Sequence, residues 1–109
     1  MKVKVSDFAE RQINATADSI EQSSGKASRK KFRQRIRHAI RLLRQHPNLG
    51  PTESFLSDGS IKYRNVVVTP LNKLIYTVCD DLIKIVDFWD VRREPTTLVD
   101  EVMKETQNY

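Results

Sequence analysis

Cysteine, long apolar runs and metal-ligand motifs are almost absent from this sequence. Cys79 is the only cysteine, so an internal disulfide is excluded, and we expect a buried structural thiol rather than a catalytic one. His38 and His46 match no metal-ligand spacing, so neither a metal site nor a cofactor is predicted. No apolar run has the ~20 residues of a membrane span, and the first residues lack the features of a secretory signal. These absences predict a cytoplasmic protein without membrane contact.

Acidic residues are missing from the stretch between Gln22 and Thr52, which contains nine Lys or Arg residues. The rest of the chain has ten basic and fourteen acidic residues, so the net charge of +5 is concentrated in this one stretch. Such an asymmetry predicts a polyanionic partner, or an acidic protein that covers the basic region.

A short strand at residues 2–5 and two helices are predicted in the first half of the chain. Ser6 is a suitable N-cap for the first helix, which should end at residues 23–25. Its apolar face has helical spacing and consists of Ala9, Ile13, Ala17 and Ile20. The second helix should run over residues 26–45 and end before Pro47. Its apolar stripe consists of Phe32, Ile36, Ala39, Ile40 and Leu43.

The second helix also carries a row of cations on a separate face, which we call the cationic ridge. On a helical wheel these six side chains fall within about 80° of each other, roughly 120° from the apolar stripe. Repulsion between these like-charged neighbours would destabilise an isolated helix by roughly 1–2 kcal/mol. The ridge is either a solvated face or a surface for RNA, DNA or an acidic protein. Its members are Lys26, Lys30, Arg33, Arg37, Arg41 and Arg44.

Three strands are predicted in the second half, with strand-forming residues at 66–68, 74–78 and 82–89. Turns at residues 70–72 and 80–81 are short enough to make neighbouring strands antiparallel. A long connection at 46–59 precedes them, and a short helix at about 97–107 follows. The prediction is one α+β domain over residues 1–109, with its core at about 2–95. The sequence does not decide which face of the 61–69 strand is buried.

Four motifs in this order carry a resemblance to a known family. They are KVKVSDFAERQI at the start, LLRQHPNLG at the end of the helices, YRNVVV with LIYTVCDD in the middle, and IVDFWDVRREP at the end. Over about residues 2–95 the chain resembles the RelE/ParE superfamily, the toxins of bacterial type II toxin–antitoxin and plasmid stabilisation systems. The resemblance implies a sheet with two helices packed on one side. It also implies a growth-inhibiting toxin that is neutralised by a cognate antitoxin.

The superfamily divides by mechanism, and the resemblance leaves the choice open. RelE-like members are endoribonucleases that cut mRNA on the ribosome without a metal, and ParE-like members inhibit DNA gyrase. Arg64 matches the strand arginine that contacts the scissile phosphate in the nucleases, and Lys62 projects from the same face. Arg92 and Arg93 match the basic position after the last strand in both branches. Arg64 could instead form a structural ion pair with Asp87 or Asp90.

Asp90 stands near the place where nucleases of this family often have His or Tyr. A carboxylate there could act as a catalytic base, but neighbouring arginines would keep it ionised and weakly basic. It could also orient Arg92, Arg93 or Arg64. Three alternatives follow: a ribosome-dependent mRNA endonuclease, a gyrase inhibitor without chemistry of its own, and an inactive homologue that only binds antitoxin.

Overall fold

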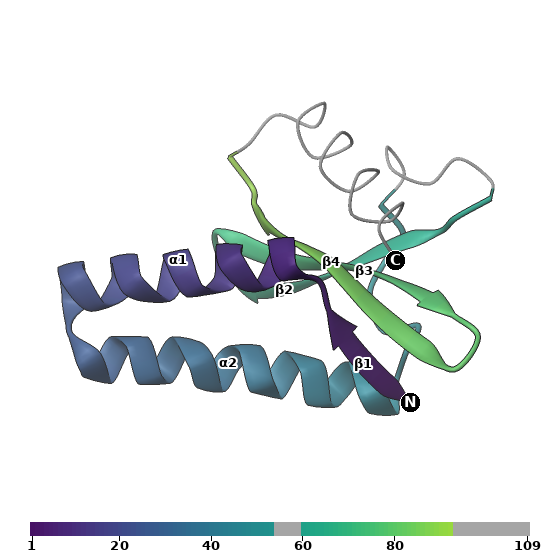
Figure 1. Ribbon diagram of the computed structural model, residues 1–109, viewed down its shortest axis with the longest axis horizontal. Coiled ribbons are helices and arrows are strands. Elements are labelled where there is room, and N and C mark those ends of the chain that lie inside the picture. Colours follow the sequence, from purple (N-terminus) through teal and green to yellow (C-terminus); the bar gives the residue numbers. More distant parts are fainter. Residues whose placement is uncertain (54–59, 93–109) are drawn as a thin grey trace.

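The computed structural model describes residues 1–53 and 60–92, which form a four-stranded sheet and a helical hairpin (Figure 1). The α+β order confirms the predicted strand, two-helix hairpin and three-stranded meander. The helix predicted at about 97–107 lies outside the described residues. The elements in chain order are β1 (Lys2–Val5), α1 (Asp7–Ser24), α2 (Lys26–Gln45), β2 (Tyr63–Thr69), β3 (Asn72–Cys79) and β4 (Leu82–Asp90).

The strand order in the sheet is β1-β4-β3-β2, which places β2 at one edge. β2, β3 and β4 pair antiparallel through two short turns, as predicted. β1 pairs parallel with β4, and the helical hairpin forms part of the long connection that a parallel pair requires. The turn between β3 and β4 places Asp80 at a φ of 56°, a left-handed conformation that Asp tolerates better than most residues.

Both helices begin and end where the sequence predicts, for local reasons. The Ser6 hydroxyl accepts a hydrogen bond from the Ala9 N–H at 3.0 Å, and this caps α1. Gly25, with a φ of 92°, separates α1 from α2 and allows the chain to reverse. α2 ends at Gln45, two residues before Pro47. The hairpin packs on one face of the sheet (Figure 1).

The main core lies between the helical hairpin and the sheet. The predicted apolar stripes face inward, and Phe32 of α2 meets Phe88 of β4 edge to face, with ring centroids 5.8 Å apart. A second buried cluster lies on the other face of the sheet and contains Tyr63, Ile75, Val86 and Trp89.

The structure answers one question about the strands that the sequence left open, and it corrects one prediction. Both faces of β2 are used, because Val66 and Val68 pack toward the helices while Tyr63 belongs to the second cluster. The prediction of a buried Cys79 is wrong: this residue ends β3, next to the turn and beyond the main core, and is exposed. Within residues 1–53 and 60–92, no helix is both long and apolar enough to cross a membrane.

Candidate functional site

Asp90 and Arg92 form a tight ion pair at the exit of β4. Arg92 donates from Nε to Asp90 Oδ1 at 2.9 Å and from Nη2 to Oδ2 at 2.7 Å, a two-pronged geometry that fixes both groups. The backbone N–H of Arg92 also donates to Asp90 Oδ1. The hydrogen bond and the charge of Asp90 raise the pKa of Arg92. Asp90 therefore orients Arg92, one of the roles that the sequence suggested.

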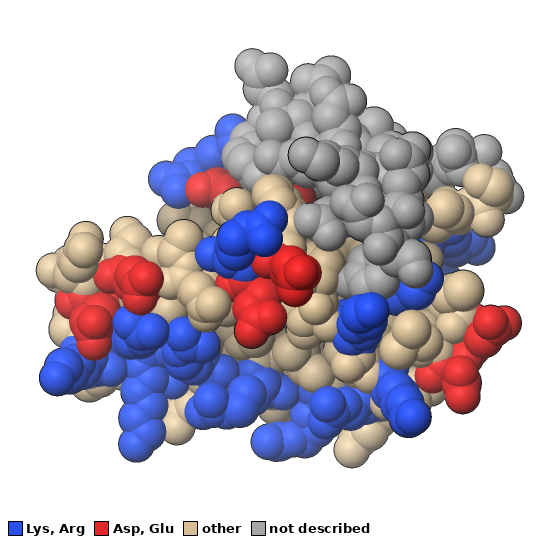
Figure 2. All heavy atoms as spheres, viewed as in Figure 1, with Lys and Arg blue, Asp and Glu red and all other residues tan. Residues whose placement is uncertain are grey.

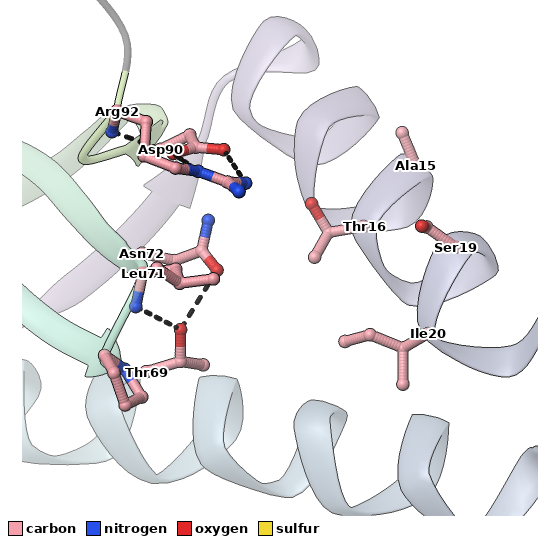
Figure 3. Close-up of a pocket in the computed structure, with 10 residues that line it drawn as sticks. Ala15, Thr16, Ser19, Ile20, Thr69, Leu71, Asn72, Asp90 and Arg92 are labelled. Atoms are coloured by element: carbon pink, nitrogen blue, oxygen red, sulfur yellow. Dashed lines mark hydrogen bonds and ion pairs between the residues drawn. The ribbon is translucent and has the colours of Figure 1, made fainter. Parts of the chain in front are cut away.

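This pair borders an open cleft of about 630 Å³ between α1 and the turn that joins β2 to β3 (Figure 3). Small side chains on α1, Ala15 and Ser19, form one wall, and Leu71 and Asn72 contribute to the other. The turn is held by Thr69, whose hydroxyl contacts Asn72 Oδ1 at 3.0 Å and accepts from the Leu71 N–H. The volume is in the range of ligand-binding clefts. On the β4 side, the cleft is bordered by Asp90 and Arg92, whose opposite charges neutralise each other.

Arg64 is engaged at a different place, on the segment that follows α2. Its Nη1 donates to the backbone carbonyl of Gly50 at 2.8 Å. The Tyr76 hydroxyl, opposite Arg64 on β3, donates to Pro47 O at 2.9 Å and accepts from the Gly50 N–H at 3.0 Å. Arg64 and Tyr76 together hold residues 47–50 against the sheet. Of the alternatives left open for Arg64, the ion pair with Asp87 or Asp90 is absent from the described residues, and the guanidinium bonds a carbonyl instead.

The cluster around Gly50 is tightly packed and largely closed to water. Burial raises the pKa of the Tyr76 hydroxyl, while the hydrogen bond from Gly50 and the charge of Arg64 lower it. The net direction is upward, so the hydroxyl keeps its proton at neutral pH and can donate to Pro47. A Cβ at position 50 would lie 1.9 Å from the backbone oxygen of Asn65. Only glycine fits there without a shift of the backbone.

Arg64 and the Asp90–Arg92 pair are not brought together by the sheet. Arg64 stands opposite Tyr76, whereas Asp90 stands opposite Asn72, four residues away along β3. At 3.3 Å per residue this separation is about 13 Å along the strand, with a further strand between them. Lys62 is exposed just before β2, and Arg93 lies outside the described residues. The described residues therefore do not bring Arg64 to the charged exit of β4.

The cationic ridge forms an exposed row on α2, and Figure 2 shows blue side chains gathered along this helix. Arg33 is half-buried and donates to Asn14 Oδ1 at 3.1 Å. The acidic residues Asp18 and Glu21 of α1 pair with Arg29, which is not a ridge residue. Among the described residues, no ridge side chain has an acidic partner. The ridge thus offers positive charge that no acidic side chain within residues 1–53 and 60–92 neutralises.

Several structural contacts and one charged stripe were not predicted from the sequence. The contact between Gly50 and Tyr76 could not be predicted, because it joins a loop to a strand across 26 positions. A second stripe on α2, formed by Lys31, Arg35 and His38, could have been found from its helical spacing of four and three. This stripe was not distinguished from the longer row of cations that forms the ridge on the same helix.

One comparison identifies relatives of this chain. A family model described as the ParE toxin of the type II toxin–antitoxin system, parDE, matches residues 3–95. The match covers both helices, β2, β3 and β4, and all of β1 except its first residue. No curated protein matches the chain.

Proposed function

Because the chain belongs to the ParE toxin family of type II toxin–antitoxin systems, we propose that it arrests growth by binding DNA gyrase on DNA, without chemistry of its own. A cognate antitoxin is the partner that this family implies. The gyrase target goes beyond what the family alone implies, and the arrangement of the two arginine sites supports it.

The observation that supports the proposal most strongly is that Arg64 on β2 and Arg92 after β4 form separate structural contacts. Cleavage of RNA through its 2′-hydroxyl requires a base, a cation and a proton donor within reach of one phosphate. Arg64 is bonded to the Gly50 carbonyl, and Arg92 is bonded to Asp90, about 13 Å away along the strand direction. Among the described residues these groups do not converge on one phosphate. A toxin that acts by binding has no need of such convergence.

The cationic ridge supports a target that includes DNA. From Lys26 to Arg44 the ridge spans about 27 Å of helix, which is comparable with eight base pairs of duplex. Ridge cations that displace counterions from the phosphates would add affinity without reading sequence. In this proposal the ridge residues Lys26, Lys30, Arg33, Arg37, Arg41 and Arg44 hold the toxin on the DNA that gyrase has bound.

A ribosome-dependent endoribonuclease is the second candidate, favoured by a specific observation. Lys62 is exposed and Arg64 is only half-buried, so both could still meet a phosphate at the edge of β2. In that case Arg64 would exchange its bond with Gly50 for one with RNA. The ridge would then hold ribosomal RNA, and this candidate requires a rearrangement that brings the exit of β4, with Asp90 and Arg92, to the phosphate bound at β2.

Induced expression in a host without the antitoxin separates these candidates. Total mRNA and plasmid topology are followed over the first minutes, together with an SOS reporter. The gyrase proposal predicts relaxed or cleaved plasmid, an SOS response and intact mRNA. Rapid mRNA cleavage with unchanged plasmid would replace it with the nuclease. Normal growth with neither effect would leave an inactive homologue that only binds antitoxin.

A further inference from the structure

The exposed surface of α2 carries cations along both of its sides. Besides the cationic ridge, Lys31, Arg35 and His38 recur at spacings of four and three and form the second stripe. On a helical wheel the centres of the ridge and of this stripe lie about 130° apart. Every residue of the two rows is exposed except Arg33, which is half-buried. α2 therefore presents positive charge in two directions.

An uncharged strip separates the two rows. It consists of Ala27, Gln34 and Gln45, all of which are exposed. On the wheel the strip lies roughly 160° from the buried residues of α2, so it faces away from the core. In the view of Figures 1 and 2, α2 runs along the lower edge of the molecule, where blue side chains gather. The ridge and the second stripe thus flank the part of α2 that faces directly outward.

A hollow borders each of the two rows. One hollow of about 280 Å³ is lined by Glu21 of α1 and by ridge residues, among them Lys30 and Arg37. The other, of about 340 Å³, lies between α2 and β2, where the second stripe lines it together with apolar residues that include Leu42 and Val68. Because the surface recedes on both sides, α2 projects from the domain between the two hollows.

The charges of both rows are left without acidic partners. Within residues 1–53 and 60–92 no side chain of the ridge or of the second stripe forms an ion pair. Asp18 and Glu21, the acids of α1 nearest in the structure to α2, pair with Arg29 instead. A partner that satisfies this surface must therefore place negative charge on both sides of one helix.

The major groove of B-form DNA has this arrangement. It is about 12 Å wide, and an α-helix with its side chains measures about 10–12 Å across, so a helix fits between the two phosphate backbones. The minor groove, at about 6 Å, is too narrow for a helix, and side chains cannot read the deep, narrow major groove of A-form RNA. A helix that lay along the outside of a duplex would use one row of cations only. The two rows together favour the major groove of DNA.

We propose that α2 inserts into the major groove of double-stranded DNA, with the ridge on the phosphates of one strand and the second stripe on those of the other. This inference deepens the proposed function and rests on it for the choice of DNA as the polyanion. Gln34, in the middle of the uncharged strip, faces the base edges, where its amide can both donate and accept hydrogen bonds. The toxin therefore binds duplex DNA in the absence of gyrase.

The salt dependence of binding tests whether both rows contact phosphates. The intact toxin is titrated, without gyrase, into a fluorescent DNA duplex of about 12 base pairs, and log K is plotted against log[salt]. Each cation on a phosphate adds about 0.9 to the magnitude of the slope, so Lys31→Gln and Arg35→Gln should each reduce it by about 0.9. Both sites are exposed and glutamine is a good helix former, so the variants should fold.

Arg11→Gln is the matched control for these two variants. Arg11 belongs to α1, where its guanidinium carbon lies 5.9 Å from the centroid of the Phe8 ring, and it is part of neither row. Its slope should equal that of the wild type. Wild-type slopes in folded Lys31→Gln and Arg35→Gln would overturn the proposal, because only the ridge would then contact the DNA.

Methylation by dimethyl sulfate identifies the groove. The reagent modifies guanine N7, which lies in the major groove, and adenine N3, which lies in the minor groove. At saturating toxin the reactivity of N7 in a short duplex should be largely lost, and that of N3 should be unchanged. Full N7 reactivity in the bound duplex would overturn the placement of α2. Tighter binding to RNA of the same length, single-stranded or duplex, would overturn DNA as the partner.

These outcomes are distinct from those of the gyrase assay. Binding in the major groove together with normal supercoiling would refute only the gyrase target. Inhibition of gyrase by a toxin that does not bind duplex DNA alone would refute only the placement of α2.

Discussion

Replacement of Arg64 and of Tyr76 should have the same consequence if both residues only hold residues 47–50 on the sheet. Tyr76→Phe leaves the Gly50 N–H and the Pro47 carbonyl without their partner. One net hydrogen bond and the cost of unsatisfied groups together reduce the free energy of unfolding by about 2 kcal/mol. In a domain of this size that lowers Tm by roughly 10 °C.

Arg64→Ala removes the donor to the Gly50 carbonyl and should lower the free energy of unfolding by about 1–2 kcal/mol, because the buried residue loses a hydrogen bond from a charged group. Thermal denaturation followed by circular dichroism measures both losses. Growth inhibition is then compared at a temperature well below either Tm, where both variants are folded.

Both variants should remain toxic under these conditions. Tyr76→Phe is the matched control, because it loosens the same segment without removing a cation. If folded Arg64→Ala loses toxicity while Tyr76→Phe keeps it, Arg64 contacts the target and the structural role is refuted. Arg64→Lys then tests whether charge alone restores the activity, since lysine cannot reproduce the planar guanidinium.

Three further outcomes follow from the same contacts. Gly50→Ala should lower the free energy of unfolding by about 3 kcal/mol, because its Cβ meets the Asn65 backbone oxygen, and an unchanged Tm would contradict the packing. Asp90→Asn should leave toxicity intact because Asp90 orients Arg92 and does not take a proton; loss of toxicity in a folded variant would instead support a catalytic base. Because burial raises the pKa of Tyr76 in the folded state, the unfolded state loses its proton first, so stability should fall above about pH 10. Urea unfolding from about pH 8 to pH 10.5 should show a smaller decline for Tyr76→Phe than for the wild type.

Much of the fold could be predicted from local signals in the chain. The second helix was placed at residues 26–45 because an apolar stripe lies between Gly25 and Pro47, both of which oppose helix formation. The strands followed from short runs of β-branched and aromatic residues between turns. The parallel pairing of β1 with β4 and the edge position of β2 depend on contacts between distant segments, which no local pattern contains.

The site was predicted less well, for the same physical reason. The Asp90–Arg92 pair could be inferred because its members are two residues apart. The partner of Arg64 is the carbonyl of a loop residue, and a backbone group leaves no signal in the sequence. The exposure of Cys79 depends on where β3 extends beyond the helices, which the strand pattern does not reveal.

The central claim, that this ParE-family toxin acts by binding gyrase, is tested most directly with purified components. The toxin is added to gyrase, ATP and relaxed plasmid, and supercoiling and DNA cleavage are read on a gel, with antitoxin as the reversing control. The account predicts that supercoiling stops, that cleaved plasmid accumulates, and that antitoxin prevents both. Normal supercoiling at saturating toxin, together with cleavage of mRNA on purified ribosomes, would contradict it.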